Sequence, residues 1–142
     1  MRIGFQIKTL SRMIRKAIDD TPTFRQNENL TGIQGWVLRF LYDKEKAEED
    51  VFQRDVERMF QVRRSTATEL LNTMEQNGYV RRTSVEHDAR LKKLSLTEKG
   101  RSLQEEVFSA IDGVEQSLTK NFTLEEKDTL IRLLEKLKEN LE

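Results

Sequence analysis

The sequence predicts a mainly α-helical protein of one domain that carries one small β-hairpin. Apolar residues recur at helical spacing towards both ends of the chain, whereas residues 84–97 (SVEHDARLKKLSLT) contain two short strand-like runs around a turn. The 142 residues include one proline and six glycines, and 35% are charged against 36% hydrophobic. This balance is typical of a folded, soluble helical protein with the length of a single domain.

The composition excludes several kinds of site. The chain has no cysteine and one histidine, His87, so disulfides and thiolate metal sites are excluded and any metal would have to be held by carboxylates alone. No phosphate-binding glycine motif occurs and the histidine falls in an expected turn, so we expect neither an enzyme nor a cofactor. No 18-residue apolar run is present and charges recur through the first 20 residues. We therefore expect no membrane span or secretion signal, and a cytoplasmic protein.

The first third of the chain predicts two helices. Residues 2–19 carry one apolar stripe, residues 19–29 with Pro22 form a connecting loop, and the next helix begins at Thr31, where Gln34 completes a capping box. The apolar stripe of the first helix comprises Ile3, Ile7, Leu10, Ile14 and Ala17, and the buried face of the second comprises Ile33, Trp36, Val37, Phe40 and Leu41.

The central third predicts two helices joined by a tight turn. After a charged bend at residues 45–50, Val51 and Phe52 form a short extended segment, and residues 53–62 form a short amphipathic helix. The longer helix that follows starts at Ser65 or Thr66 and stops at Gly78 in the left-handed conformation. Its capping box is Thr66 with Glu69, and its buried positions are Leu70, Leu71 and Met74.

A β-hairpin and two more helices complete the chain. Val80, Leu94 and Leu96 are apolar positions on the hairpin strands, and the turn falls at residues 86–90. Thr97 caps a long helix, and residues 122–142 form the last one. The apolar positions of these helices are Leu103, Val107, Ile111, Val114 and Leu118, then Leu130, Leu134, Leu137 and Leu141.

A short helix, a tight turn, a second helix and a hairpin form the element order of a winged helix-turn-helix. In such a module the start of the second helix can enter the major groove of DNA, and the hairpin, or wing, can lie over the neighbouring minor groove. Arg90 is expected to enter the minor groove with Asp88 as a brace for its guanidinium, and Lys92 and Lys93 to contact phosphates. The expected major-groove residues are Arg63, Arg64, Ser65, Thr66 and Thr68.

The charge distribution agrees with a polyanionic partner. The formal net charge is zero, yet residues 54–101 carry 11 basic and 7 acidic side chains while residues 102–142 carry 5 and 10. A basic middle beside an acidic tail is expected where one part meets DNA and another meets protein or solvent.

The segments QRDVERMFQVRRSTATELLNTMEQNGYVRR and DARLKKLSLTEKG resemble the MarR family of bacterial regulators over nearly the whole chain. The wing is similar to that family's D-x-R-x-K signature at Asp88, Arg90 and Lys92. The resemblance implies a homodimer that binds pseudo-palindromic double-stranded DNA, usually as a repressor, and releases it when a small, frequently phenolic effector binds. Glu57, Gln61 and Arg63 depart from the family's usual small, Gly or Asn, and Ser residues.

We therefore interpret residues 1–142 as one MarR-type domain, with a DNA-binding core at 31–100 and dimerisation helices at 1–20 and 101–142. The terminal stripes could instead close a monomeric core, but they exceed what the small central module can cover. By resemblance, Leu10, Trp36, Phe40 and Phe108 are candidates for an effector pocket, with an ordinary core position as the alternative. The alternative function is a winged-helix scaffold that binds protein and not DNA.

Overall fold

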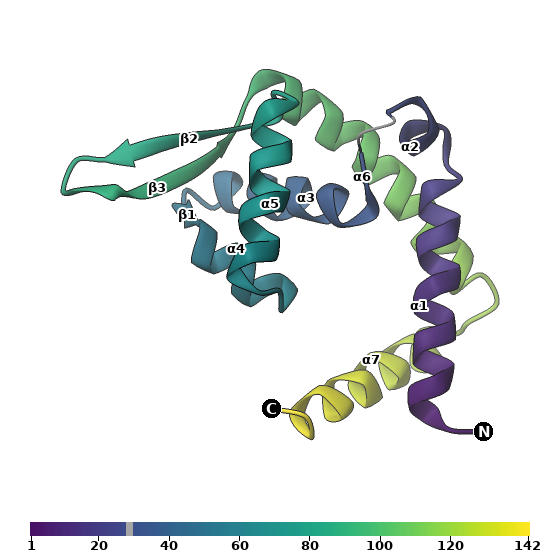
Figure 1. Cartoon of the computed structure of the whole chain (residues 1–142). Helices are drawn as coiled ribbons and strands as arrows, with labels where there is room; N and C mark the ends of the chain where they lie inside the picture. The colour runs from purple at the N-terminus through teal and green to yellow at the C-terminus, as the bar shows by residue number, and fades with distance from the viewer. Residues whose placement is uncertain (28–29) are drawn as a thin grey trace.

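The computed structural model describes residues 1–27 and 30–142, and these form a mainly helical fold with a three-stranded antiparallel sheet (Figure 1). The predicted fold class is therefore confirmed. The elements are α1 (Ile3–Asp19), α2 (Pro22–Gln26), α3 (Gly32–Lys46), β1 (Val51–Phe52), α4 (Gln53–Phe60), α5 (Arg64–Gln76), β2 (Val80–Val85), β3 (Asp88–Leu96), α6 (Glu98–Leu118) and α7 (Leu124–Glu139).

The sheet has the order β1-β3-β2, and β2 and β3 form the wing that projects from one side of the molecule (Figure 1). Val51 pairs with Leu94, which confirms the short extended segment expected there. Val80 pairs with Leu96 at the wing root, and the register shifts between Ser84 and Val85 near the tip. Leu94 and Leu96 are buried, so alternate residues of β3 fasten the wing to the core.

The core lies where α3, α5 and α6 meet the wing root. Its most deeply buried apolar side chains come from α3, α4, α5 and α6, so the helix-turn-helix pair and the long helix share one interior. These side chains are Val37, Leu38, Val56, Ala67, Leu71, Met74 and Val107, each at 0% exposure.

Two predicted caps are present. The N–H of Gln34 donates to Thr31 Oγ1 while the N–H of Thr31 donates to Gln34 Oε1, both at 3.4 Å, which confirms the capping box of α3. The N–H of Gly100 donates to Thr97 Oγ1 at 3.0 Å and starts α6.

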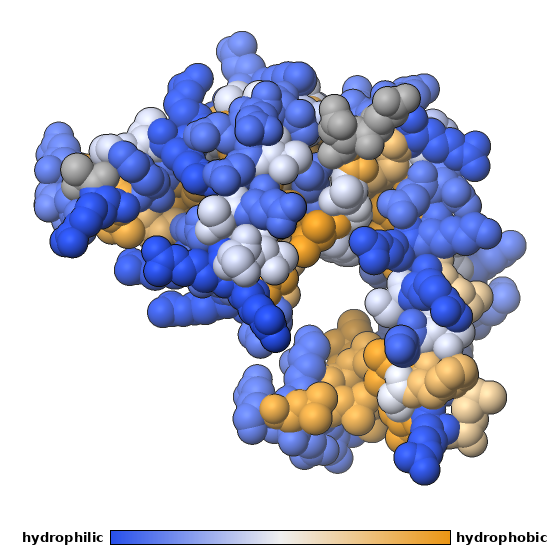
Figure 2. Space-filling model, in the orientation of Figure 1, coloured by the Kyte–Doolittle hydropathy of each residue, from blue (hydrophilic) through white to orange (hydrophobic). Residues whose placement is uncertain are grey.

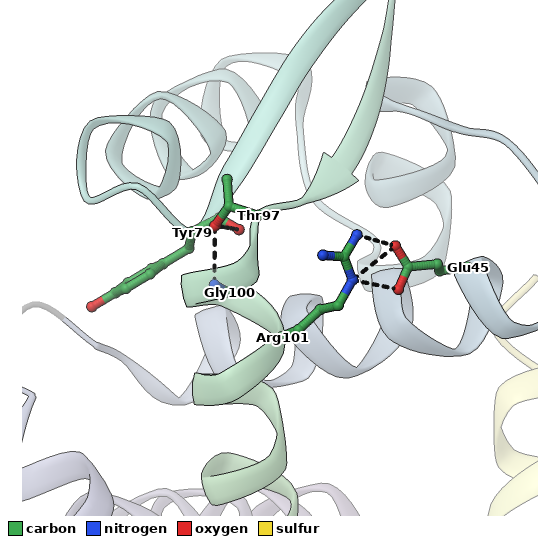
Figure 3. A network of polar contacts seen from close by, with 5 residues as sticks. All are labelled: Glu45, Tyr79, Thr97, Gly100 and Arg101. Atoms are coloured by element: carbon green, nitrogen blue, oxygen red, sulfur yellow. Dashed lines mark hydrogen bonds and ion pairs between the residues drawn. The ribbon is translucent and has the colours of Figure 1, made fainter.

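Figure 3 shows how α6 is fixed at the wing root. The N–H of Thr97 donates to the carbonyl oxygen of Tyr79 at 3.1 Å, directly before β2. Gly100 packs so closely on this carbonyl that an added Cβ would overlap it. The first turn of α6 can approach the Tyr79 carbonyl this closely only because Gly100 has no side chain.

A forked ion pair ties α6 to the end of α3. Arg101 donates from Nη2 to Glu45 Oε1 at 2.7 Å and from Nε to Oε2 at 2.9 Å (Figure 3). These hydrogen bonds hold the pKa of Glu45 below its usual value and raise the pKa of Arg101. The fork fixes the orientation of the wing-bearing end of α6 relative to α3.

The structure corrects two expectations for the first third of the chain. The connection expected to be a loop contains the helix α2, which Pro22 begins and Phe24, 5% exposed, anchors in the core; residues 28–29 of that connection lie outside the described residues. Trp36 was expected to be buried and is 39% exposed. The reason is that α3 turns its Gly35 side, rather than Trp36, towards Phe24 and Val107.

The terminal helices leave apolar faces uncovered. No residue of α7 is buried, and Ile18 is the buried residue of α1. Figure 2 shows apolar side chains gathered over α7 and the nearby part of α1, away from the wing. The most exposed are Ile3, Phe5, Met13, Leu124 and Ile131, at 60–78%.

Candidate nucleic-acid interface

The turn between α4 and α5 depends on one residue in the left-handed conformation. Gln61 has φ +52° and ψ +48°, and its N–H donates to the carbonyl of Glu57, which closes α4. The sequence position at which the family often has Gly or Asn is therefore a position that needs positive φ. This sharp turn places the start of α5 on the surface.

Helix α5 begins earlier than expected. Arg63 is the N-cap, with extended φ/ψ of −71°/156° and no side-chain capping bond, and Ser65 and Thr66 already lie inside the helix. The prediction of a cap at Ser65 or Thr66, with a Thr66–Glu69 capping box, is therefore wrong. Because no side chain caps this end, the backbone amides of the first turn are available to an anion.

The predicted major-groove residues lie together at this end of α5. Arg63, Arg64, Ser65 and Thr66 are exposed. Thr68 is half-buried and has internal partners: its hydroxyl donates to the carbonyl of Arg64 at 2.8 Å and accepts from Nε2 of Gln53 at 2.8 Å. The bond from Gln53 holds the start of α4 against the start of α5, whereas the bond to Arg64 lies within α5.

The wing tip presents Arg90 to solvent. The turn consists of residues 86–87, and β3 begins at Asp88. The Arg90 side chain is 94% exposed, with Nε 3.5 Å from Asp88 Oδ1, whereas the Arg90 backbone N–H donates to the same oxygen at 2.9 Å. Asp88 therefore fixes the main chain at the turn more firmly than it fixes the guanidinium.

The two lysines of the wing have different surroundings. Lys92 donates to Ser84 Oγ at 2.6 Å across the hairpin, and Lys93 forms a 3.0 Å ion pair with Asp50, which precedes β1. Neighbouring strand residues point to opposite faces of a sheet. The two ammonium groups therefore lie on opposite sides of the wing.

A cationic groove connects α5 with the wing. It is lined by five basic side chains and one carboxylate, together with Phe52, Gln53, Thr68, Leu91 and Leu94. In a groove walled by protein this imbalance attracts an anion. The charged lining residues are Arg54, Arg64, Arg82, Arg90, Lys92 and Glu57.

Two of these cations, Arg54 and Arg82, were not predicted from the sequence. Arg82 follows the buried Val80 by two residues, so strand alternation turns both side chains to the same face, towards α5. That spacing was the available signal. Within the described residues Nε and Nη2 of Arg82 are buried and have no hydrogen-bond partner, which is costly for a cation and favours an anionic partner.

The residues predicted for an effector pocket lie on α1, α3 and α6. Phe40 packs edge-to-face on Phe60 of α4, with ring centroids 5.9 Å apart, and the Arg39 guanidinium lies 4.0 Å from the centroid of the Phe108 ring. Trp36, Phe108 and Leu10 are 39%, 41% and 50% exposed. Of the four predicted pocket residues, Phe40 therefore packs in the core, and the other three are partly exposed.

No group of three or more His, Asp or Glu side chains in the described part of the chain is arranged to hold a metal ion. None of the helices in residues 1–27 and 30–142 has both the length and the apolar character that crossing a membrane requires.

Comparisons with known proteins agree with this geometry. A family model described as MarR family matches residues 28–91. The uncharacterised HTH-type transcriptional regulator YybA of Bacillus subtilis (strain 168) is 27% identical over 131 residues, which cover 92% of this chain and 85% of that protein.

Solved structures extend the similarity to the whole fold. The transcription regulator MarR from Oenococcus oeni PSU-1 is 30% identical, with a TM-score of 0.76, over 97% of this chain and 99% of that one. The S. aureus MepR–DNA complex is 24% identical, with a TM-score of 0.89, over 99% of this chain and 97% of that one. These relatives are transcriptional regulators and not enzymes, and the chain belongs to the MarR family of winged-helix transcriptional regulators.

Proposed function

We propose that this regulator binds double-stranded DNA, with the start of α5 in the major groove and Arg90 in the adjacent minor groove. The observation that carries the proposal is the groove between α5 and the wing, where five cations face one carboxylate. Phosphates are the anions that a duplex presents along its backbone, and their neutralisation supplies much of the binding free energy. Similar structures solved with DNA support this assignment.

Each predicted residue has a role in this arrangement. Arg63, Arg64, Ser65 and Thr66 contact base edges or phosphates, and Thr68 with Gln53 keeps the start of α5 in position. The exposed Arg90 side chain extends from a turn that Asp88 has already fixed, which reduces the entropy lost on insertion into the narrow minor groove. The minor groove is bordered by one sugar-phosphate backbone on each side. Lys92 contacts a phosphate of one backbone, and Lys93 contacts a phosphate of the other after giving up its ion pair with Asp50.

The functional unit is a homodimer formed through the N- and C-terminal helices. The uncovered apolar faces of α1 and α7 are at the end of the molecule away from the wing (Figure 2), where pairing would leave both wings free. A two-fold axis there would present two α5 helices to successive major grooves, about 34 Å apart on one side of a pseudo-palindromic site.

The protein acts as a repressor that a small aromatic effector releases from DNA. The support is that three of the residues predicted for an effector pocket, Leu10 on α1, Trp36 on α3 and Phe108 on α6, are apolar side chains left partly exposed. An effector shifts the population only if it binds the conformation with misplaced α5 helices more tightly than the DNA-competent one. Trp36 is the one tryptophan of the sequence, so quenching of its fluorescence by a phenolic ligand, with release of a bound duplex, tests this step.

A fluorescence anisotropy titration with a random-sequence duplex at 50 and 200 mM salt tests the DNA-binding function. A dimer that neutralises six or more phosphates should lose about 10³-fold or more in affinity between these concentrations. Hydroxyl-radical footprinting upstream of its own gene should then show protection on one face of the duplex, repeating every 10–11 base pairs, roughly one helical turn. No binding at low salt would refute the proposal and favour a winged-helix scaffold that binds protein.

A further inference from the structure

Helix α5 presents a polar stripe beyond the residues at its start. The exposed positions recur at spacings of 4, 3 and 4, on the face opposite the buried Ala67, Leu71 and Met74. The stripe consists of Ser65, Glu69, Asn72 and Gln76, and the open surface around it also includes Arg64, Thr68 and Thr73.

Several polar groups of this surface already have partners. The Thr68 hydroxyl is bonded to Gln53 and to the carbonyl of Arg64, and the Thr73 hydroxyl donates to the carbonyl of Glu69 at 3.0 Å. In contrast, no hydrogen bond or ion pair among the described residues engages the carboxylate of Glu69. Glu69 therefore offers two free acceptor oxygens on the face of α5 that the proposed function turns towards DNA.

A free carboxylate on a DNA-facing surface is repelled by phosphates, so it needs a hydrogen-bond donor on the duplex. The donors at base edges in the major groove are the amino groups of cytosine and adenine, and a carboxylate, which only accepts, is suited to cytosine N4. Adenine presents an acceptor beside its amino group, which suits an amide such as glutamine instead. Glu69 lies five residues after Arg64, about 7.5 Å along the helix axis, which places it inward from the phosphate-binding end.

We propose that Glu69 is a specificity-determining residue that accepts a hydrogen bond from the amino group of one cytosine in each half-site. The inference rests on the proposed DNA-binding function and deepens it. Phosphate contacts in the groove bind any duplex, whereas the contact of Glu69 strengthens binding to a duplex that has cytosine at that position.

The test is selection from a randomised duplex library with the wild-type chain, Glu69→Gln and Glu75→Gln. Glu75 is exposed on the same helix but does not line the surface around the stripe, so its substitution removes the same charge without the proposed base contact. We expect the wild type and Glu75→Gln to select cytosine at one position of each half-site. Glu69→Gln should select adenine there, with the ratio of affinities for the two duplexes changed by about 5-fold or more.

The outcomes separate this inference from the proposed function. Binding of the wild type to no duplex at low salt would refute DNA binding itself. Two results would overturn the role of Glu69 alone. In the first, the wild type and Glu69→Gln bind DNA with the same base preference. In the second, the substitution changes the preference at a position where the wild type does not select cytosine. Far-ultraviolet circular dichroism of the three proteins should coincide, because both substitutions are at exposed helical positions.

Discussion

Replacing Gly100 with alanine should loosen the junction between the wing and α6. A Cβ built on Gly100 would overlap the carbonyl oxygen of Tyr79 and lie 3.0 Å from its carbonyl carbon. Both are backbone atoms, so the first turn of α6 must retreat by about one ångström to restore an ordinary carbon–oxygen contact. That movement stretches the hydrogen bonds by which Thr97 joins α6 to the start of β2.

The expected magnitude follows from these contacts. Forcing a methyl group into a close-packed site costs about 1–3 kcal/mol, and loss of the cap between Gly100 and Thr97 costs about 1 kcal/mol. The higher helix propensity of alanine offsets at most about 1 kcal/mol. We expect the free energy of unfolding to fall by about 1–3 kcal/mol, and Tm by about 3–10 °C for a chain of this length.

Gly32→Ala is the matched control. Gly32 is the first residue of α3, and a Cβ there meets nothing within 4 Å. Thermal and urea unfolding followed by circular dichroism, at one protein concentration, should place this variant within about 0.5 kcal/mol of the wild type. Equal stabilities of the Gly32→Ala and Gly100→Ala proteins would refute the close approach of α6 to Tyr79.

Three further predictions concern stability and assembly. Arg101 lowers the pKa of Glu45, so the stability that this carboxylate contributes is fully present above its ordinary pKa of 4.5 and is lost as the pH falls through the lowered value. Because both side chains are more than a third exposed, urea unfolding of Glu45→Gln should show a loss of only about 0.5–1 kcal/mol in the free energy of unfolding at neutral pH. A loss that persists unchanged at about pH 2 would contradict this prediction. Gln61→Val places a β-branched residue at φ +52° and should cost about 1–2 kcal/mol, whereas Gln61→Asn should be tolerated; equal Tm values would argue against the left-handed turn. Ile131→Glu puts a charge on the uncovered face of α7 and should halve the mass that light scattering gives for the proposed dimer, and an unchanged mass would exclude that face from the interface.

Much of the fold follows from local rules that the sequence displays. The Thr31–Gln34 capping box and the Thr97 cap depend on residues three positions apart, so no tertiary information is needed to predict them. The wing follows in the same way, because Val80, Leu94 and Leu96 alternate with polar residues about a turn. These features also place Arg90 at the tip.

The wrong predictions of secondary structure arise where tertiary contacts override the local preferences of the residues. The start of α5 is set by the left-handed turn at Gln61, so the helix begins at Arg64 although Ser65 and Thr66 are better caps. The short α2 exists because Phe24 has a site in the core, which a loop-like composition does not reveal.

Part of the candidate site was hidden for a related reason. Arg82 looks like a solvated strand residue in the sequence, and only the pairing of β2 with β3 against α5 makes it a wall of the cationic groove. Thr68 shows the reverse case. The sequence predicts that it contacts DNA, but its hydroxyl accepts a hydrogen bond from Gln53 of α4.

The most direct test of the DNA-binding account is the salt dependence of operator binding by the wild type, Arg90→Ala and Lys120→Ala. Lys120 is exposed in the connection between α6 and α7, and that connection lies on the side of the molecule away from the wing (Figure 1). Its loss therefore changes the net charge equally without removing the wing contact. We expect Arg90→Ala to weaken binding and to lower the slope of log K against log salt by about two for a dimer, with Tm and dimer mass unchanged. Lys120→Ala should bind like the wild type, and equal affinities and slopes for all three proteins would contradict a role for the wing.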